Sequence, residues 1–184
     1  HGRMNLLYNL ARTLAFAPVM LFGQTIAQAA FPVLSREKDR LDEFKVTFIT
    51  SFNQMLYLVL PISAIILVLR IPIVRLVYGA DMFDWGATVL TGQILAYFSI
   101  SIFAQALAIL LYRAFFALQN TVTPLVVGAI STLIMIIVAY YLVVLNPGGI
   151  QSVAIAFTLA NVFQVVVLFF LLDRKVGRFD QLRV

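Results

Sequence analysis

The chain has 184 residues, of which 62% are hydrophobic and only 11% are charged. Water-soluble globular proteins have about half apolar and roughly a quarter charged residues, so the composition excludes that class and indicates an integral membrane protein. The formal net charge of +5 is interpreted as a topology signal and an attraction to anionic lipid. It is not read as a nucleic-acid-binding surface, because acidic residues interrupt the basic runs.

Five apolar runs predict membrane-spanning helices. They cover about residues 5–34, 47–69, 88–112, 124–145 and 150–172. Each reaches or exceeds the ~20 residues that a helix needs to cross ~30 Å of hydrocarbon. The predicted fold class is therefore all-α, a polytopic membrane helix bundle.

The first span carries a charge, Arg12, inside an apolar run that ends at Pro18. A guanidinium stays charged at accessible pH, and its burial in hydrocarbon costs several kcal/mol, so it needs water, a partner or a ligand. Arg12 either faces a cavity or lies near the membrane face and extends its head group to lipid phosphates. It is the first candidate for a substrate-binding residue.

Other polar side chains form stripes along the predicted spans. At about 100° per residue, Asn9 lies on the face of Arg12, and Gln24 and Gln28 follow beyond Pro18 as further substrate-binding candidates. The cavity-lining candidates of the third and fifth spans are Gln93, Tyr97, Gln105, Asn161 and Gln164. Because amides are costly in contact with lipid, these faces should point into the bundle, where they either line a cavity or form interhelical hydrogen bonds.

Prolines and loops predict how the spans are interrupted and joined. Pro18 and Pro61 should interrupt their helices and free backbone carbonyls. Residues 35–46 should form a charged helical lead-in, and Pro72 should end a helix before a short surface helix at residues 73–78. Residues 146–149 predict a tight turn that makes the last two spans an antiparallel hairpin.

The basic residues predict the orientation. Nine of them lie on one side of the predicted topology, at Arg36, Lys38, Arg40, Lys45, Arg113, Arg174, Lys175, Arg178 and Arg183; the other four are Arg3, Arg12, Arg70 and Arg75. The positive-inside rule then places the first connection and the C-terminus in the cytoplasm and the N-terminus outside.

The residues offer little for enzyme chemistry. His1 is the one histidine, and no carboxylate occurs within the apolar parts of the spans, so neither a His/Asp metal site nor an acid–base pair can be built. Asp81 and Asp84 either touch a cation or belong to a solvated turn. Nucleotide-binding motifs are missing. We therefore expect a protein that is not an enzyme and uses no cofactor and no metal.

Several motifs together resemble the MviN/MurJ family of lipid II flippases. They are residues 21–35, the Leu60-Pro61 pair, residues 71–79 and residues 112–124, in the family's order and spacing across nearly the whole chain. The most specific motif runs from Phe115 to Pro124. Two positions depart from the family pattern: Asn120 stands where the family usually has Asp, and Arg12 lies six residues before Pro18, where the family arginine more often lies five before.

The resemblance implies a transporter of fourteen helices, with two six-helix lobes around a cationic cavity, in the multidrug/oligosaccharidyl-lipid/polysaccharide exporter superfamily. This chain, residues 1–184, would be part of the C-terminal lobe, with the N-terminal lobe missing. We expect a multi-pass protein of the bacterial inner membrane. Its expected substrate is lipid II or a related polyprenyl-pyrophosphate glycolipid, and its expected partners are membrane lipids and the missing lobe.

The resemblance also implies the mechanism, which is alternating access of the two lobes with Arg12 helping to neutralise the pyrophosphate. Three alternatives stay open. The protein could be a polysaccharide-lipid flippase, a multidrug exporter of the same superfamily, or a membrane subunit without transport activity.

Overall fold

The structure is a computed structural model that describes residues 2–78, 84–145 and 150–177. Its elements in chain order are α1 (Gly2–Pro18), the π-helix η1 (Val19–Gln24), α2 (Thr25–Arg36), α3 (Leu41–Val68), α4 (Arg70–Tyr78), α5 (Trp85–Ala117), α6 (Val122–Leu145) and α7 (Ile150–Val176). No β-strand occurs in these ranges, and the predicted all-α bundle is confirmed. Asp81 and the predicted turn at residues 146–149 lie outside the described residues.

Five helices are long and apolar enough to cross a membrane, as predicted. They are Asn5–Arg36, Leu41–Val68, Trp85–Ala117, Val122–Val144 and Ser152–Val176. The predicted helical lead-in at residues 35–46 is only partly right: α2 ends at Arg36, residues 37–40 form a turn, and α3 begins at Leu41. The second span begins earlier than predicted because residues 41–46 continue directly into it. The third also begins earlier, at Trp85, because the Asp84 side chain accepts a hydrogen bond from the Ala87 backbone N–H at 3.1 Å and so satisfies a free donor of the first turn.

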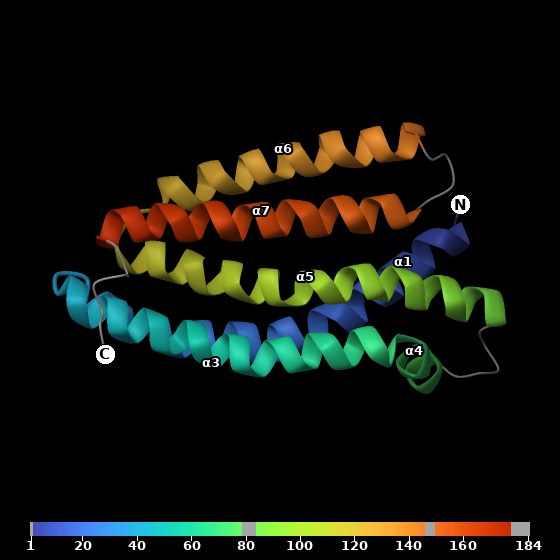
Figure 1. Cartoon of the computed structure of the whole chain (residues 1–184), viewed down its shortest axis with the longest axis horizontal. Coiled ribbons are helices and arrows are strands. Elements are labelled where there is room, and N and C mark those ends of the chain that lie inside the picture. Colours follow the sequence, from blue (N-terminus) through green and yellow to red (C-terminus); the bar gives the residue numbers. More distant parts are fainter. Residues whose placement is uncertain (1, 79–83, 146–149, 178–184) are drawn as a thin grey trace.

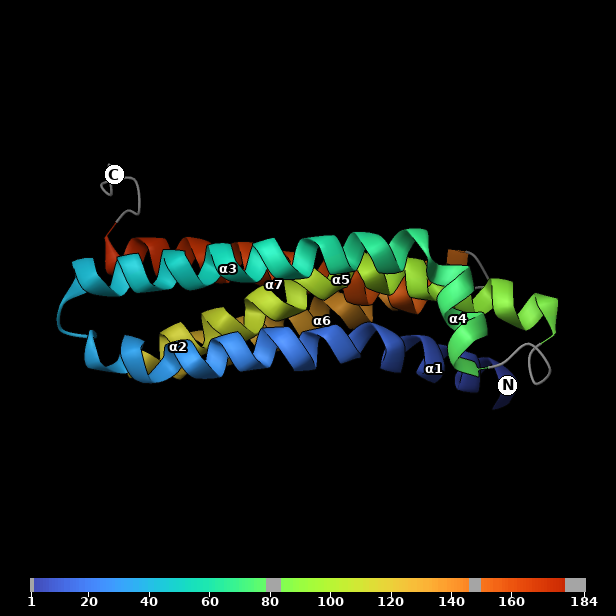
Figure 2. The same cartoon turned by 90° about the horizontal axis from the view of Figure 1, so that it is seen from below.

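The helices surround α5. In Figure 1, α6 and α7 lie on one side of α5 and α3 on the other. Figure 2 shows α1, η1 and α2 as one continuous rod on the opposite side of the molecule from α3. The most apolar stretch of α5 is 72% buried against 17% for that of α6, which packs mainly on α7. In this part of the protein, α5 forms the core and α6 the periphery.

Small and hydroxyl residues allow the helices to approach α5 closely. Ser63 donates a hydrogen bond to the Ser99 carbonyl, and Thr158 donates one to the Tyr97 carbonyl at 3.0 Å. Such bonds satisfy polar groups that would otherwise meet hydrocarbon. For Thr158 the structure therefore shows an interhelical hydrogen bond between α7 and α5.

The prolines do not break the spans as predicted. Pro18 ends α1, but η1 continues the same rod, and Pro61 lies inside α3. A proline has no backbone N–H to donate to the carbonyl four residues earlier in the helix. A π-turn is one way in which a helix accommodates this missing hydrogen bond. Pro72 does not end a helix either: α3 ends at Val68, and Pro72 lies in the first turn of α4, where its N–H would have no intrahelical partner.

Gly23 lies where the first span approaches Ala106 of α5 closely, which gives a prediction. A Cβ atom at Gly23 would lie 3.1 Å from the Ala106 Cβ and 3.2 Å from its Cα. In the full-length protein, Gly23→Val should therefore destabilise the fold by about 1–3 kcal/mol through overpacking. Thermal unfolding of the purified protein in detergent measures the effect. Gly86→Val is the matched control, because the nearest atom to a Cβ there is the Asp84 Oδ2 at 3.9 Å; equal melting temperatures for the two variants would contradict the close approach.

Candidate functional site

Arg12 and Asn9 lie together on the outer surface of α1. They line an open groove of about 510 Å³, together with Thr13, Phe16, Ala17 and Met20. The two side chains are exposed, and the Arg12 guanidinium lies over the Phe16 ring at 5.1 Å. Among the described residues, no carboxylate forms an ion pair with Arg12. The groove thus presents a positive charge with no protein counter-ion in the described part of the chain.

The position of Arg12 along the span is compatible with both predicted roles. The 32 residues of the first span extend about 48 Å at ~1.5 Å per residue, so about 9 Å projects beyond each face of a ~30 Å hydrocarbon layer. Arg12 lies seven residues from Asn5, about 10 Å along the axis. The guanidinium therefore lies close to the edge of the hydrocarbon, from where it could reach either a central cavity or lipid phosphates.

The other two candidates on the first span lie away from this groove. Gln24 is half-buried at the end of η1, Gln28 is exposed on α2, and neither lines the groove of Arg12. A rotation of about 100° per residue already turns Gln24 by ~120° from Arg12 on an ideal helix. The π-turns of η1 add a further change of phase that the sequence pattern did not predict.

Gln105 is buried, and its side chain is hydrogen-bonded within α5. Its amide nitrogen donates to the Ser101 hydroxyl at 2.7 Å, and Ser101 in turn donates to the Phe98 carbonyl at 2.8 Å. Gln93 is exposed instead, because each i, i+4 step drifts by about 40° and three steps turn it well away from Gln105. Tyr97 lies between them and packs partly buried against the core. The predicted single stripe is therefore twisted around α5.

Gln164 lines a second groove, which the sequence analysis did not place. Its amide nitrogen donates to the Tyr112 hydroxyl, and the two side chains share an open, mostly apolar groove of about 730 Å³. The groove is bounded by Phe116, Thr121, Val122, Pro124, Leu125, Gly128, Ala129 and Thr132. Asn161, one turn before Gln164, bonds instead to the Phe157 carbonyl of its own helix at 2.8 Å. The polar residues thus belong to at least two separate surfaces.

Two further hydrogen bonds lie near the ends of the spans, and the first joins residues too far apart for sequence spacing to reveal. The Tyr78 hydroxyl donates to the Leu10 carbonyl at 3.0 Å, which ties α4 to α1 two residues before Arg12. Burial raises the pKa of the Tyr78 hydroxyl above its ordinary value, so the hydroxyl remains a donor at neutral pH.

The start of α6 is held by a local cap. The Asn120 Oδ1 accepts a hydrogen bond from the Thr123 backbone N–H at 3.2 Å. An Asp carboxylate at this position could accept the same backbone bond.

Among the described residues, no group of three or more His, Asp and Glu side chains is close enough to hold a metal ion. Asp84 caps α5, as described above. The arrangement in the described ranges therefore offers anion binding at Arg12 as its clearest chemistry.

Comparisons with known proteins agree on one family. The sequence profile described as "Lipid II flippase MurJ" matches residues 4–184. A probable lipid II flippase MurJ of Treponema pallidum (strain Nichols) is 28% identical over 157 residues, which cover 84% of this chain and 30% of that protein. A second, from Rhizobium meliloti (strain 1021), is 32% identical over 124 residues, covering 66% of this chain and 23% of that protein.

A solved structure gives the same fold. A lipid II flippase MurJ in an inward closed conformation superposes with a TM-score of 0.78 at 23% identity, covering 89% of this chain and 34% of that chain. The chain therefore spans about a third or less of the length of the proteins that it matches. Because the family profile matches almost the whole sequence, the chain belongs to the MurJ family of lipid II flippases.

Proposed function

We propose that this chain forms part of the C-terminal lobe of a flippase that moves lipid II from the cytoplasmic to the outer leaflet of the bacterial inner membrane. The observation that carries the proposal is the family match over residues 4–184. The five candidate spans support it, as does Arg12, which forms no ion pair among the described residues. The rest of the protein, including an N-terminal lobe, would complete the transport path.

Arg12 is the proposed contact for the pyrophosphate of the lipid. A guanidinium presents two parallel N–H donors to a phosphate and remains charged in a medium of low dielectric. Asn9 lies in the same groove and can add an uncharged hydrogen bond. In an alternating-access cycle, the two lobes would expose this groove first to one face of the membrane and then to the other, while the polyprenyl tail stays in lipid.

The other polar candidates receive different proposed roles. We assign Gln105 to packing, since its amide is already bonded to Ser101. Gln164 belongs to the groove that it shares with Tyr112. That groove and the groove of Arg12 have no lining residue in common. Gln24, Gln28, Gln93, Tyr97 and Asn161 are not assigned to the pyrophosphate contact.

The proposed orientation gives a labelling prediction. The basic residues predict a cytoplasmic first connection and an external N-terminus. The 184 residues contain no cysteine. In the full-length protein, with any cysteine elsewhere replaced by serine, single cysteines at Lys38 and Gln119 should resist an impermeant thiol reagent in intact cells, whereas one at Gly86 should react. Reaction of all three sites after permeabilisation controls for accessibility. Labelling of Lys38→Cys from outside would contradict the proposed orientation.

Complementation tests the proposed function. The full-length gene should restore growth and wall synthesis to a bacterium depleted of its own lipid II flippase. A strain depleted of a polysaccharide-lipid flippase serves as the specificity control. Rescue of the second strain but not of the first would favour the related transporter and contradict the proposal.

A further inference from the structure

The short helix α4 has a position unlike that of the other helices. In Figure 1 it is seen almost end-on, while the spans run across the picture, and in Figure 2 it crosses the end of the bundle beside the start of α5. One face packs inward: Val74 is 1% exposed, and Ile71 approaches Gly92 so closely that a Cβ there would lie 3.2 Å from the Ile71 Cγ1. The helix therefore lies across the spans at one end of the bundle.

The depth of α4 relative to the hydrocarbon layer can be estimated from the length of α5. Its 33 residues extend about 50 Å, so roughly 10 Å projects beyond each face of a ~30 Å hydrocarbon layer. Two contacts of α4 fall on the first two turns of α5: Arg75 lies over the Trp85 ring, and Ile71 approaches Gly92. From Trp85 to Gly92 the helix rises about 10 Å. With α5 centred in the hydrocarbon layer, α4 would lie where α5 emerges from it.

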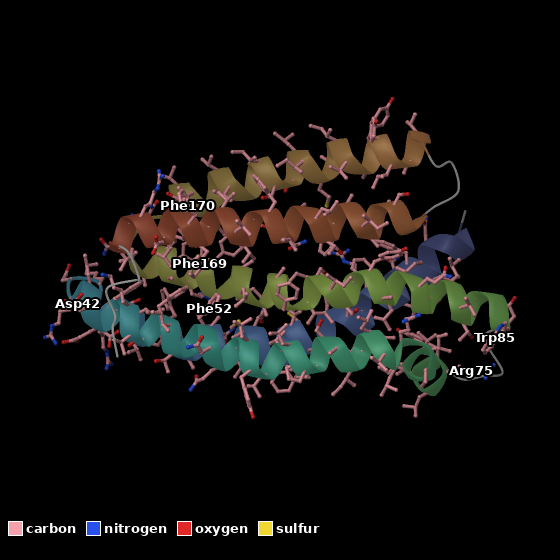
Figure 3. All side chains as sticks on the ribbon, viewed as in Figure 1. Asp42, Phe52, Arg75, Trp85, Phe169 and Phe170 are labelled. Carbon is pink, nitrogen blue, oxygen red and sulfur yellow. The ribbon has the colours of Figure 1, made fainter. Side chains whose placement is uncertain are left out.

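The outward face of α4 combines apolar and cationic groups. Leu76 is 87% exposed and Val77 is 50% exposed, although both are aliphatic. Beside them, the Arg75 guanidinium lies over the Trp85 ring at 4.7 Å, and Figure 3 shows both side chains together at this end of the bundle. Tryptophan and arginine are typical of membrane–water interfaces, where an aliphatic side chain enters the acyl layer and a cation meets phosphate.

The two arginines of α4 differ in whether their side chains are already hydrogen-bonded within the protein. The Arg70 Nη1 donates to the Leu67 carbonyl at 3.0 Å, so it satisfies an acceptor at the end of α3. Arg75 is exposed, its guanidinium lies over the Trp85 ring, and no carboxylate among the described residues forms an ion pair with it. A cation held on an aromatic ring keeps its N–H donors free at the edge, which suits a phosphodiester.

We propose that α4 lies in the membrane–water interface and that Arg75, held on Trp85, binds the phosphodiester of an anionic phospholipid. Leu76 and Val77 enter the acyl region, and Arg75 reaches the head group above them. The ligand is a component of the bilayer, independent of the transported lipid. The Tyr78–Leu10 hydrogen bond then ties this anchored helix to the part of α1 that carries Arg12.

Quenching of Trp85 by lipids tests the proposal. Trp85 is the one tryptophan of the 184 residues, so it can be isolated in the full-length protein by changing any other tryptophan to phenylalanine. Brominated phosphatidylcholine should quench its fluorescence, and brominated phosphatidylglycerol should quench it more strongly at the same mole fraction. Arg75→Gln should weaken the binding of phosphatidylglycerol about fivefold, the effect of roughly one cationic side chain at an anionic membrane. Inorganic phosphate should not compete.

The controls separate this site from general effects. Arg40→Gln removes an exposed cation that pairs with Glu43 at 3.2 Å in the connection between α2 and α3, and it should leave the quenching unchanged. Quenching by aqueous iodide without quenching by either lipid would show a solvated helix and overturn the proposal. Absence of quenching by all of these reagents would show that protein covers the face, with the same consequence. An unchanged phosphatidylglycerol preference in Arg75→Gln, or competition by inorganic phosphate, would overturn the assignment of the phosphodiester site.

Discussion

Replacement of Arg12 by alanine in the full-length protein should abolish transport while the protein remains in the membrane. Two charge-assisted hydrogen bonds to a pyrophosphate contribute about 1.5–3 kcal/mol each, so their loss corresponds to about a 100-fold or larger fall in transport. The side chain is exposed and pairs with no carboxylate among the described residues, so alanine should not unfold the protein. Growth of a flippase-depleted strain, with membrane levels checked by immunoblot, measures the effect.

Two further substitutions distinguish binding of substrate from contact with lipid head groups. Arg12→Lys should retain part of the activity, because the charge survives while the planar pair of donors is lost. Arg12→Glu should be worse than alanine, because it places a negative charge beside the proposed pyrophosphate. If Arg12 only contacts lipid phosphates, lysine should be fully equivalent and alanine nearly silent, since the helix stays long enough to span. Robust growth with the alanine variant would remove Arg12 from the transport mechanism.

Expression of residues 1–184 alone should give no transport at all. The chain corresponds to 30% of the Treponema pallidum relative and 34% of the solved MurJ chain, so most of a family member lies outside it. A substrate site between two lobes requires both of them. The fragment should still insert, because its five spans carry their own hydropathy signal. Complementation by the fragment, at a membrane level equal to that of the full-length control, would contradict the two-lobe mechanism.

Hydropathy alone was sufficient to predict the five spans and the all-α class. A span needs only length and apolar composition, and both are local properties of the sequence. The placement of Asn9 beside Arg12 was predictable for a similar reason, because the two residues are three apart on one regular helix. Local periodicity is reliable over one turn.

The remaining features depend on tertiary contacts or on helical phase over several turns. On an ideal helix, Gln24 is already rotated by about 120° from Arg12, and the π-turns of η1 add to this. The drift of about 40° in each i, i+4 step likewise separates Gln93 from Gln105. The bond between Gln164 and Tyr112 joins residues 52 apart, and no local pattern contains that information. Sequence reasoning therefore found the polar residues but grouped them on too few surfaces.

Translocation of lipid II by the purified full-length protein tests the central claim most directly. Vesicles containing the protein and lipid II on one leaflet should expose the head group to an impermeant modifying reagent on the other side, faster than empty vesicles do. The Arg12→Ala protein, reconstituted at the same density, should match the empty vesicles. Translocation by the unchanged protein at the empty-vesicle rate, or undiminished translocation by the Arg12→Ala protein, would contradict the account.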